Sequence, residues 1–141
     1  MKNQLPNTSK KGFTLVELMV VIAIIAVLAA VGIAVFSTQQ QNARDSRRRA
    51  DIDSYASAYE AGFNSTTGQY PALTGANFAG GVAPVDPTNS GAFVFTTSGA
   101  LPGTSWTVCA KLEAGSGGNS SNNTGTAAAN GGFYCKKNQQ S

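Results

Sequence analysis

Apolar residues near the start of the chain follow one another without a break. From Leu18 to Phe36 the sequence runs for 19 residues with no charged or strongly polar side chain. This length lies within the range of about 17–25 residues that a helix needs to cross a bilayer. No other segment of the sequence approaches it. The pattern therefore predicts one membrane-competent helix, with the carboxylate of Glu17 at its N-terminal end.

Beyond this run the apolar positions become periodic. Ile52, Tyr55, Tyr59 and Phe63 are separated by three, four and four residues. That spacing places them on one face of a helix. No proline interrupts the chain between the apolar run and Pro71. We expect one helix from about Thr14 to Phe63, apolar all round in its first half and amphipathic in its second.

Charged residues of both signs alternate along the expected second half of the helix. The arginines are Arg44, Arg47, Arg48 and Arg49. The i,i+4 pairs are Asp45 with Arg49, Arg47 with Asp51, and Arg49 with Asp53. Such pairs contribute about 0.2–0.5 kcal/mol each on a helix surface. Four arginines would attract phosphate, but the interleaved acids favour a solvated, self-paired helix face over nucleic-acid binding.

The remaining segment, 64–141, has the composition of a small β-rich head. It has 78 residues, of which 13 are glycine and five are charged. The strand candidates are "AFVFTT" (Ala92–Thr97), "WTVCAKL" (Trp106–Leu112) and "GFYCK" (Gly132–Lys136). In the second candidate, alternate residues from Trp106 to Leu112 share one face. The predicted fold class is therefore α+β: a long N-terminal helix packed against a small antiparallel sheet.

The two cysteines, Cys109 and Cys135, fall in the last two strand candidates. If those strands pair antiparallel, the cysteines come close together. In an exported chain a disulfide is the favoured interpretation, and two buried thiols are the alternative. Between the strands lies the low-complexity segment 113–131, which we expect to be a structureless loop, either an exposed variable surface or a flexible linker.

Charge and the absence of histidine narrow the function classes. The net charge of +3 comes from three lysines that precede the apolar run, Lys2, Lys10 and Lys11. The sequence contains no histidine, so catalytic arrangements that need an imidazole base are excluded.

A basic start followed by an apolar run is typical of a secretory signal, with Gly32-Ile33-Ala34 as a small-x-small cleavage site. However, the run exceeds the usual 7–15 residues of a signal peptide.

The segment "KKGFTLVELMVVIAIIAVLAA" resembles the prepilin signature of the type IV pilin and pseudopilin superfamily. In that family a basic leader ends in glycine, a membrane peptidase cuts before phenylalanine and N-methylates the new terminus, and a glutamate follows four residues later. Gly12, Phe13 and Glu17 match these three roles. The resemblance covers the chain from Lys10 to about Pro71 well and the rest only in outline.

The resemblance implies four segments. They are a leader that is removed (1–12), a transmembrane and filament-core half-helix (13–36), an amphipathic half-helix (37–63), and a head with a disulfide-closed C-terminal loop (64–141). Glu17 would be an assembly residue, because a carboxylate in hydrocarbon costs roughly 2.5–3.5 kcal/mol and needs a partner. The new amino terminus at Phe13 of a neighbouring chain supplies one. A snorkelling acid at the membrane surface is the alternative.

The resemblance also implies partners and location. The partners are the prepilin peptidase and N-methyltransferase, other copies of the chain or pilin-like subunits, and membrane lipid before assembly. The chain would sit in the cytoplasmic membrane with its head outside the cytoplasm and then enter a cell-surface filament. The sequence leaves open a type IV pilus subunit, a pseudopilin of type II secretion and a competence minor pilin. A membrane-anchored receptor or enzyme with an uncleaved helix is the distant alternative.

We expect no cofactor and no catalytic residue. Asp86 and Asn89 lie in the region where some pseudopilins bind calcium. Two oxygen side chains fall well short of the 6–8 ligands that calcium takes. A turn is therefore the favoured interpretation of the segment "PVDPTN".

Overall fold

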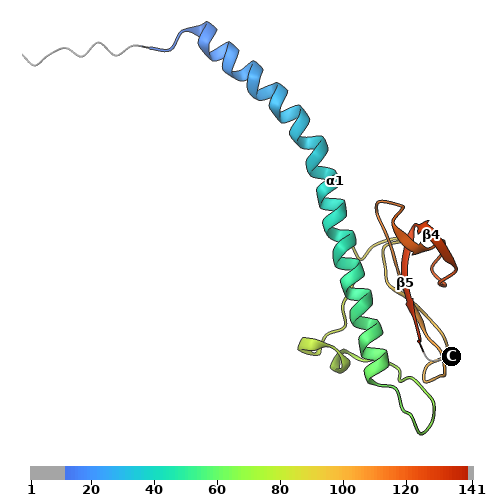
Figure 1. Ribbon diagram of the computed structural model, residues 1–141. Helices are drawn as coiled ribbons and strands as arrows, with labels where there is room; N and C mark the ends of the chain where they lie inside the picture. Colours follow the sequence, from blue (N-terminus) through green and yellow to red (C-terminus); the bar gives the residue numbers. More distant parts are fainter. Residues whose placement is uncertain (1–11, 140–141) are drawn as a thin grey trace, which may run out of the picture. The chain divides into compact units, whose positions relative to one another are not determined.

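The computed structural model describes residues 12–139. Its long helix, α1, spans Leu15–Ala61, and the strands are β1 (Thr96–Ser98), β2 (Thr107–Lys111), β3 (Gly118–Ser120), β4 (Ala127–Gly131) and β5 (Phe133–Lys137). Two short 3-10 turns, Gly75–Asn77 and Ala79–Gly81, precede the strands. The predicted α+β class is confirmed, with one N-terminal helix and one small antiparallel sheet (Figure 1).

The chain divides after Thr38 into two compact units, and α1 contributes to both. In the first unit every described side chain from position 15 onward is exposed. These side chains are mostly Val, Ile, Leu and Ala. The helix is long and apolar enough in this part to cross a membrane.

The helix ends close to where the sequence predicts. Its last residue is Ala61, two positions before the expected end. At Gly62 a Cβ atom would lie 2.6 Å from Cγ of Pro71. The returning chain therefore packs so closely against the end of α1 that only glycine fits there without rearrangement.

The second unit contains the sheet, in the order β1-β2-β5-β3-β4. All paired strands are antiparallel, and the β2–β5 register places Cys109 opposite Cys135. Both strands were expected from the sequence, and so was their antiparallel pairing. In Figure 1, β5 lies beside the second half of α1, and the hydroxyl of Tyr134 on β5 donates to Asp53 on α1 at 3.0 Å.

The core of this unit joins the amphipathic face of α1 to β2. Its buried members are Ile52, Tyr59, Tyr70, Trp106, Val108 and Ala110, with Tyr55 and Phe63 packed against them. The rings of Tyr59 and Trp106 stack with centroids 4.7 Å apart. The helical periodicity and the strand alternation both predicted these contacts. Such burial is worth about 1.5–3 kcal/mol for each large apolar side chain.

The first strand candidate is largely wrong. Only Thr96 and Thr97 of the segment Ala92–Thr97 enter a strand, since β1 spans Thr96–Ser98. The preceding residues form a loop whose Phe93 ring receives the cations of Arg48 and Lys111, at 4.9 and 5.5 Å from its centroid. Tertiary contacts with the helix and the next strand therefore override a β-prone local sequence.

The expectation of a structureless loop over 113–131 is also wrong, because β3 and β4 lie within it. At Gly118 an added Cβ would collide with the carbonyl oxygen of Phe133. Glycine at this position thus permits a close approach of strands that a composition-based interpretation assigns to a linker. The turn between β3 and β4 is held by the Asn122 side chain, whose Oδ1 accepts from the backbone N–H groups of Thr124 and Thr126 at 3.1 Å each.

Candidate functional site

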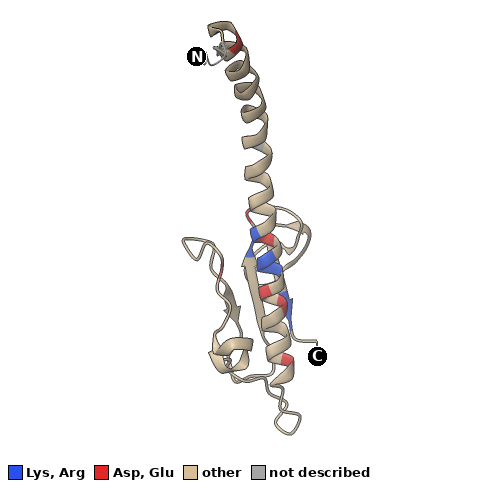
Figure 2. Ribbon diagram, turned by 90° about the vertical axis from the view of Figure 1, so that its left-hand side faces the viewer, with Lys and Arg blue, Asp and Glu red and all other residues tan. Residues whose placement is uncertain are grey.

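The first turn of α1 contains the residues that the sequence singles out for processing and assembly. Gly12 and Phe13 precede the helix, and the side chain of Phe13 is 88% exposed. The leader lysines lie outside the described residues. Figure 2 shows acidic colour in the first turn of α1, where Glu17 lies in the sequence, and charged residues again along the second half of the helix.

Glu17 has a specific partner within its own chain. Its Oε2 accepts hydrogen bonds from the backbone N–H of Thr14 at 2.9 Å and from the Thr14 hydroxyl at 2.8 Å. The N–H of Glu17 in turn donates to Oγ1 of Thr14 at 3.2 Å. This reciprocal arrangement is a capping box, which satisfies backbone donors at a helix start. The Thr-x-x-Glu spacing in the sequence is the signal for this capping box, and the prediction of Glu17 as an assembly residue did not include it.

A second charged group lies in the head-bearing unit, around Arg48. The guanidinium is fully buried and contacts three carboxylates from three parts of the chain. Asp86 accepts from Nε at 2.7 Å and from Nη2 at 2.9 Å. Asp45 and Glu113 accept from Nη1 at 2.8 and 2.7 Å. We call Arg48 and these three acids the Arg48 cluster.

Neighbouring groups extend the Arg48 cluster. Arg44 makes a two-pronged contact with Glu113, at 2.7 Å from Nε and 2.6 Å from Nη2. The carboxylate of Asp45 also accepts from the backbone N–H groups of Glu113 and Ala114, at 2.9 and 3.0 Å. The cluster therefore fastens two loops, one around Asp86 and one around Glu113, to the helix.

The arginines and carboxylates of the cluster stabilise one another's charged forms. Hydrogen bonds from Arg44, followed by those from Arg48, lower the pKa of Glu113 to about 2. Burial opposes charge on Asp86, but hydrogen bonds from Arg48 and from the N–H groups of Thr88 and Asn89 outweigh it and lower the pKa of Asp86 below its usual value. Burial likewise opposes charge on Arg48, and its carboxylate partners more than compensate, so the pKa of Arg48 is raised.

The Arg48 cluster corrects the expectation of a self-paired, solvated helix face. Arg47 and Asp51 do approach each other, with Nε and Oδ2 3.9 Å apart. The other two expected pairs are wrong: Asp45 pairs with Arg48, and Asp53 pairs with Lys136 at 3.3 Å. Arg49 instead donates to the carbonyl oxygen of Gly117 at 3.0 Å.

The calcium candidates take part in this same arrangement. Both carboxylate oxygens of Asp86 accept hydrogen bonds from Arg48, and Oδ1 also accepts from the N–H groups of Thr88 and Asn89 in the following turn. Arg48 thus already neutralises the carboxylate that a cation would need, which argues against Asp86 as a calcium ligand. Within residues 12–139, no group of three or more Cys, Asp or Glu side chains is placed to hold a metal ion.

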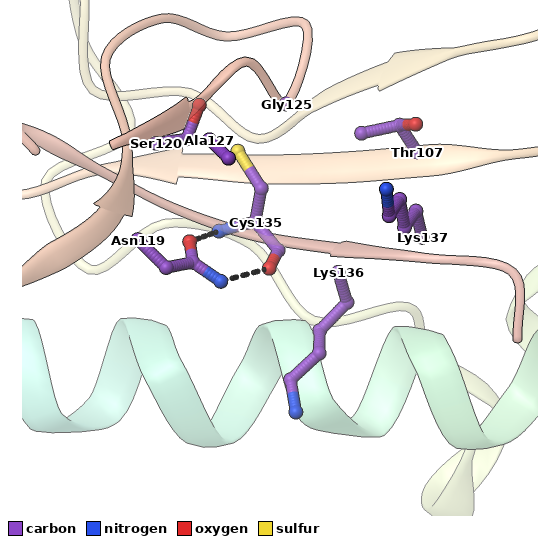
Figure 3. A pocket seen from close by; sticks show the side chains of 8 residues that line it. All are labelled: Thr107, Asn119, Ser120, Gly125, Ala127, Cys135, Lys136 and Lys137. Carbon is purple, nitrogen blue, oxygen red and sulfur yellow. Dashed lines mark hydrogen bonds between the residues drawn. The ribbon is translucent and has the colours of Figure 1, made fainter. Parts of the chain in front are cut away.

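The disulfide expected between Cys109 and Cys135 is present and joins β2 to β5. Figure 3 shows the hollow beside it, a cavity of about 240 Å³ lined partly by Cys135, Asn119 and Lys137. The Asn119 carboxamide donates to the Cys135 carbonyl at 2.8 Å and accepts from the Cys135 N–H at 2.7 Å. Asn119 therefore adds a side-chain link between β3 and β5 next to the disulfide.

Comparison with known proteins gives one match. Residues 7–33 match the protein-family model described as the prokaryotic N-terminal methylation motif. No curated protein and no solved structure matches the chain. The matched segment contains Gly12, Phe13, Thr14 and Glu17, and it is the type IV prepilin signature.

This signature describes the N-terminal segment of the chain, residues 7–33. It supports a type IV pilin-like or pseudopilin protein, and it points to a structural subunit rather than an enzyme. It implies processing by a prepilin peptidase and assembly with other pilin subunits. Together with the apolar first half of α1, it indicates membrane anchoring and later incorporation into a surface filament.

Proposed function

We propose that the chain is a structural subunit of a type IV pilus-like filament. It enters the cytoplasmic membrane as a prepilin with its head outside the cytoplasm. The prepilin peptidase cleaves it after Gly12 and N-methylates Phe13. The leader 1–12 is lost, the helix half 13–36 forms the filament core, and the helix half 37–63 carries the head 64–141.

The observation that carries this proposal is the match of residues 7–33 to the N-terminal methylation motif. The exposed apolar first half of α1 agrees with it, because such a surface needs lipid or other helices around it. After the leader is removed, contact of this apolar surface with membrane lipid is replaced by contact with other copies of the helix. The helix leaves lipid and packs against helices of other copies.

Glu17 sets the register of this packing in our proposal. A carboxylate in an apolar environment costs roughly 2.5–3.5 kcal/mol if it is unpaired. Cleavage before Phe13 creates an ammonium group that can pair with the Glu17 carboxylate of a neighbouring copy. Thr14 occupies only Oε2 in the capping box, so the same carboxylate can hold its own helix start and present Oε1 to the incoming ammonium.

The mass of the mature N-terminus tests the processing step. We expect the protein isolated from membranes or filaments to begin at Phe13 and to carry one additional methyl group. A matched Gly12→Val variant should retain the leader and stay in the membrane. Isolation of the wild-type chain with Met1 intact from filaments would refute the proposal.

The kind of filament is tested separately. Deletion of the chain should remove long surface fibres if it is a pilus subunit. If fibres persist and protein secretion or DNA uptake is lost instead, the chain is a pseudopilin of type II secretion or a competence minor pilin.

A further inference from the structure

An irregular pairing in the sheet gives one asparagine an unusual position. Along β3 the paired residues advance by two positions, from Gly118 to Ser120. Along β4 their partners, Gly131 and Ala127, are four positions apart, so β4 bulges between them. Asn130 lies in this bulge with an exposed side chain and a φ of 55°. Its backbone is therefore held less regularly than that of a paired strand residue.

A glycine follows this asparagine, and Asn130–Gly131 is the only Asn-Gly pair in the sequence. An asparagine carboxamide can react with the backbone nitrogen of the next residue, and glycine favours this reaction because it has no Cβ to hinder the approach. The bond between this nitrogen and Cγ forms, the C–N bond of the carboxamide breaks, and ammonia leaves with the proton of the peptide N–H. Water then opens the cyclic imide at either carbonyl group, which gives aspartate or isoaspartate.

The side chain of Asn130 is also less restrained than those of neighbouring asparagines. The carboxamide of Asn119 donates to and accepts from the backbone of Cys135. That of Asn122 makes hydrogen bonds across the turn between β3 and β4. Among the described residues, no hydrogen bond holds the carboxamide of Asn130, so it is free to turn towards the nitrogen of Gly131.

The strand that contains this asparagine lies at the edge of the sheet. In the strand order, β4 is the last strand and pairs with β3 alone. Edge elements open locally at a lower free energy than the whole fold. Such opening frees the N–H of Gly131 for the reaction, while the core around β2 stays closed.

Isoaspartate at this position alters the main chain as well as the charge. The main chain then runs through the former side chain and is longer by a carbon atom immediately before Gly131. At Gly131 an added Cβ would collide with the carbonyl oxygen of Ser120, so the two backbones lie too close to absorb a lengthened chain. Ser120 is fixed in place, because it is buried and its hydroxyl lies 2.7 and 2.9 Å from the carbonyl oxygens of Asn122 and Thr126.

We propose that Asn130 is the site of a spontaneous modification, in which it loses its carboxamide nitrogen and the resulting isoaspartate releases β4 from β3. Water is the co-reactant, and the reaction requires no oxidant, metal or enzyme. The inference goes beyond the proposed filament function and does not depend on it, because its steps involve the head alone. A modified head keeps the disulfide between β2 and β5 but gains a negative charge and a loose edge strand.

Ageing of the purified full chain tests the modification. After incubation in detergent micelles at mildly alkaline pH, the peptide that contains Asn130 should become heavier by the difference between an amide –NH2 and an –OH group. It should also accept a methyl group from S-adenosylmethionine in the presence of protein isoaspartate methyltransferase. Fragmentation spectra locate the change, and we expect it roughly tenfold more often at Asn130 than at Asn119 or Asn122, which glycine does not follow. No change at Asn130, or an equal change at all three asparagines, would overturn the proposal.

The matched control is Asn130→Gly, because glycine accepts the positive φ and has no carboxamide. The variant should show the same tryptophan emission as the wild type, which confirms that its head folds. On ageing it should accept no methyl group from the methyltransferase. Methylation equal to that of the wild type would place the isoaspartate elsewhere and overturn the assignment to Asn130.

A second variant, Asn130→Asp, separates the added charge from the lengthened main chain, because an ordinary aspartate leaves the main chain unchanged. In amide hydrogen exchange, the isoaspartate form isolated after ageing should exchange roughly fivefold faster than the wild type at Ser120 and Gly131. Asn130→Asp should exchange at the wild-type rate there, and the buried Val108 should stay protected in both. If the isoaspartate form exchanges like the wild type or like Asn130→Asp, the release of β4 by the lengthened chain is overturned.

Discussion

Arg48 shows most directly how single residues stabilise the head. Its guanidinium has no exposed surface, yet it remains charged because carboxylates from α1 and two loops surround it. A buried cation with this many partners contributes through the whole network, so deletion of one member leaves the others uncompensated. Sequence reasoning could not find this network, since Asp86 and Glu113 lie 38 and 65 residues from Arg48.

We expect Arg48→Met to destabilise the head by about 3–5 kcal/mol, because three carboxylates then lose their common cation. Urea denaturation of the full chain in detergent micelles, followed by tryptophan fluorescence, measures the change. Arg47→Met is the matched control, and its 70% exposed side chain should cost less than about 1 kcal/mol. Equal midpoints for the two variants would contradict the assignment of Arg48.

The structure reveals a role for Thr14 at the start of α1, where its side chain exchanges hydrogen bonds with Glu17. We expect Thr14→Val to remove both the hydroxyl donor to Glu17 and the acceptor for the Glu17 N–H, at a cost of about 1 kcal/mol to the helix start. Amide hydrogen exchange in micelles should then speed up at Glu17 by roughly fivefold. Thr14→Ser keeps the hydroxyl and should exchange at the wild-type rate, whereas an unchanged rate in the valine variant would argue against the capping box.

Among the elements, α1, β2 and β5 were predicted well, whereas β1, β3 and β4 were not. The alternation from Trp106 to Leu112 and the spacing of Ile52, Tyr55 and Tyr59 encode burial directly in the sequence. By contrast, β3 and β4 consist mainly of Gly, Ala, Asn and Ser. Residues of this kind carry no apolar period, so only the pairing of β3 with β5 and with β4, and the turn held by Asn122, define these strands.

The disulfide between β2 and β5 should contribute strongly to the free energy of unfolding, because it closes a long segment of the chain. For a sequence separation of 26, the chain-entropy relation gives roughly 3.5 kcal/mol. We expect the double variant Cys109→Ser/Cys135→Ser to lose about this much stability in urea denaturation. Added reductant should then have no further effect on the variant but should destabilise the wild type by a similar amount. A loss below about 1 kcal/mol would show that the Asn119 bridge and the sheet pairing suffice.

The loops fastened by the Arg48 cluster should respond to acid. The pKa of Glu113 is about 2 in the folded chain against an ordinary value of 4.5, and the pKa of Asp86 is lowered from 3.8. Both acids therefore stabilise the fold above these ordinary values, and the contribution is lost as the pH falls from about 4.5 towards 2. The melting temperature of the wild type should drop across this window. Glu113→Gln should start lower at neutral pH and fall less.

As a whole, the molecule combines two parts with opposite solvent requirements. The described side chains of the first unit are all exposed and largely apolar, whereas the second unit has its own aromatic core and internal ion pairs. The N-terminal signature and the apolar run were apparent from sequence because each is a local pattern. The contacts between copies depend on a partner chain, so they leave no comparable local pattern in the sequence.

For the assembled filament, the prediction concerns Glu17. We expect Glu17→Ala to lower filament yield more than tenfold, because the ammonium group of a neighbour is then buried without its carboxylate. The amount of processed subunit in filaments, compared with that in the membrane, measures the effect. Gln40→Ala, at an exposed position on the same helix, should assemble as the wild type does. Normal fibres from the Glu17 variant would refute the proposed contact.

The stacking of Trp106 on Tyr59 also has an optical consequence. Trp106 is the only tryptophan in the sequence and is 1% exposed, and all four tyrosines belong to the second unit. Excitation at long ultraviolet wavelength therefore reports on the head without a label. Emission should be blue-shifted in the folded chain and move to the red when the stack with Tyr59 separates, while the apolar first half of α1, which has no tryptophan or tyrosine, contributes no signal.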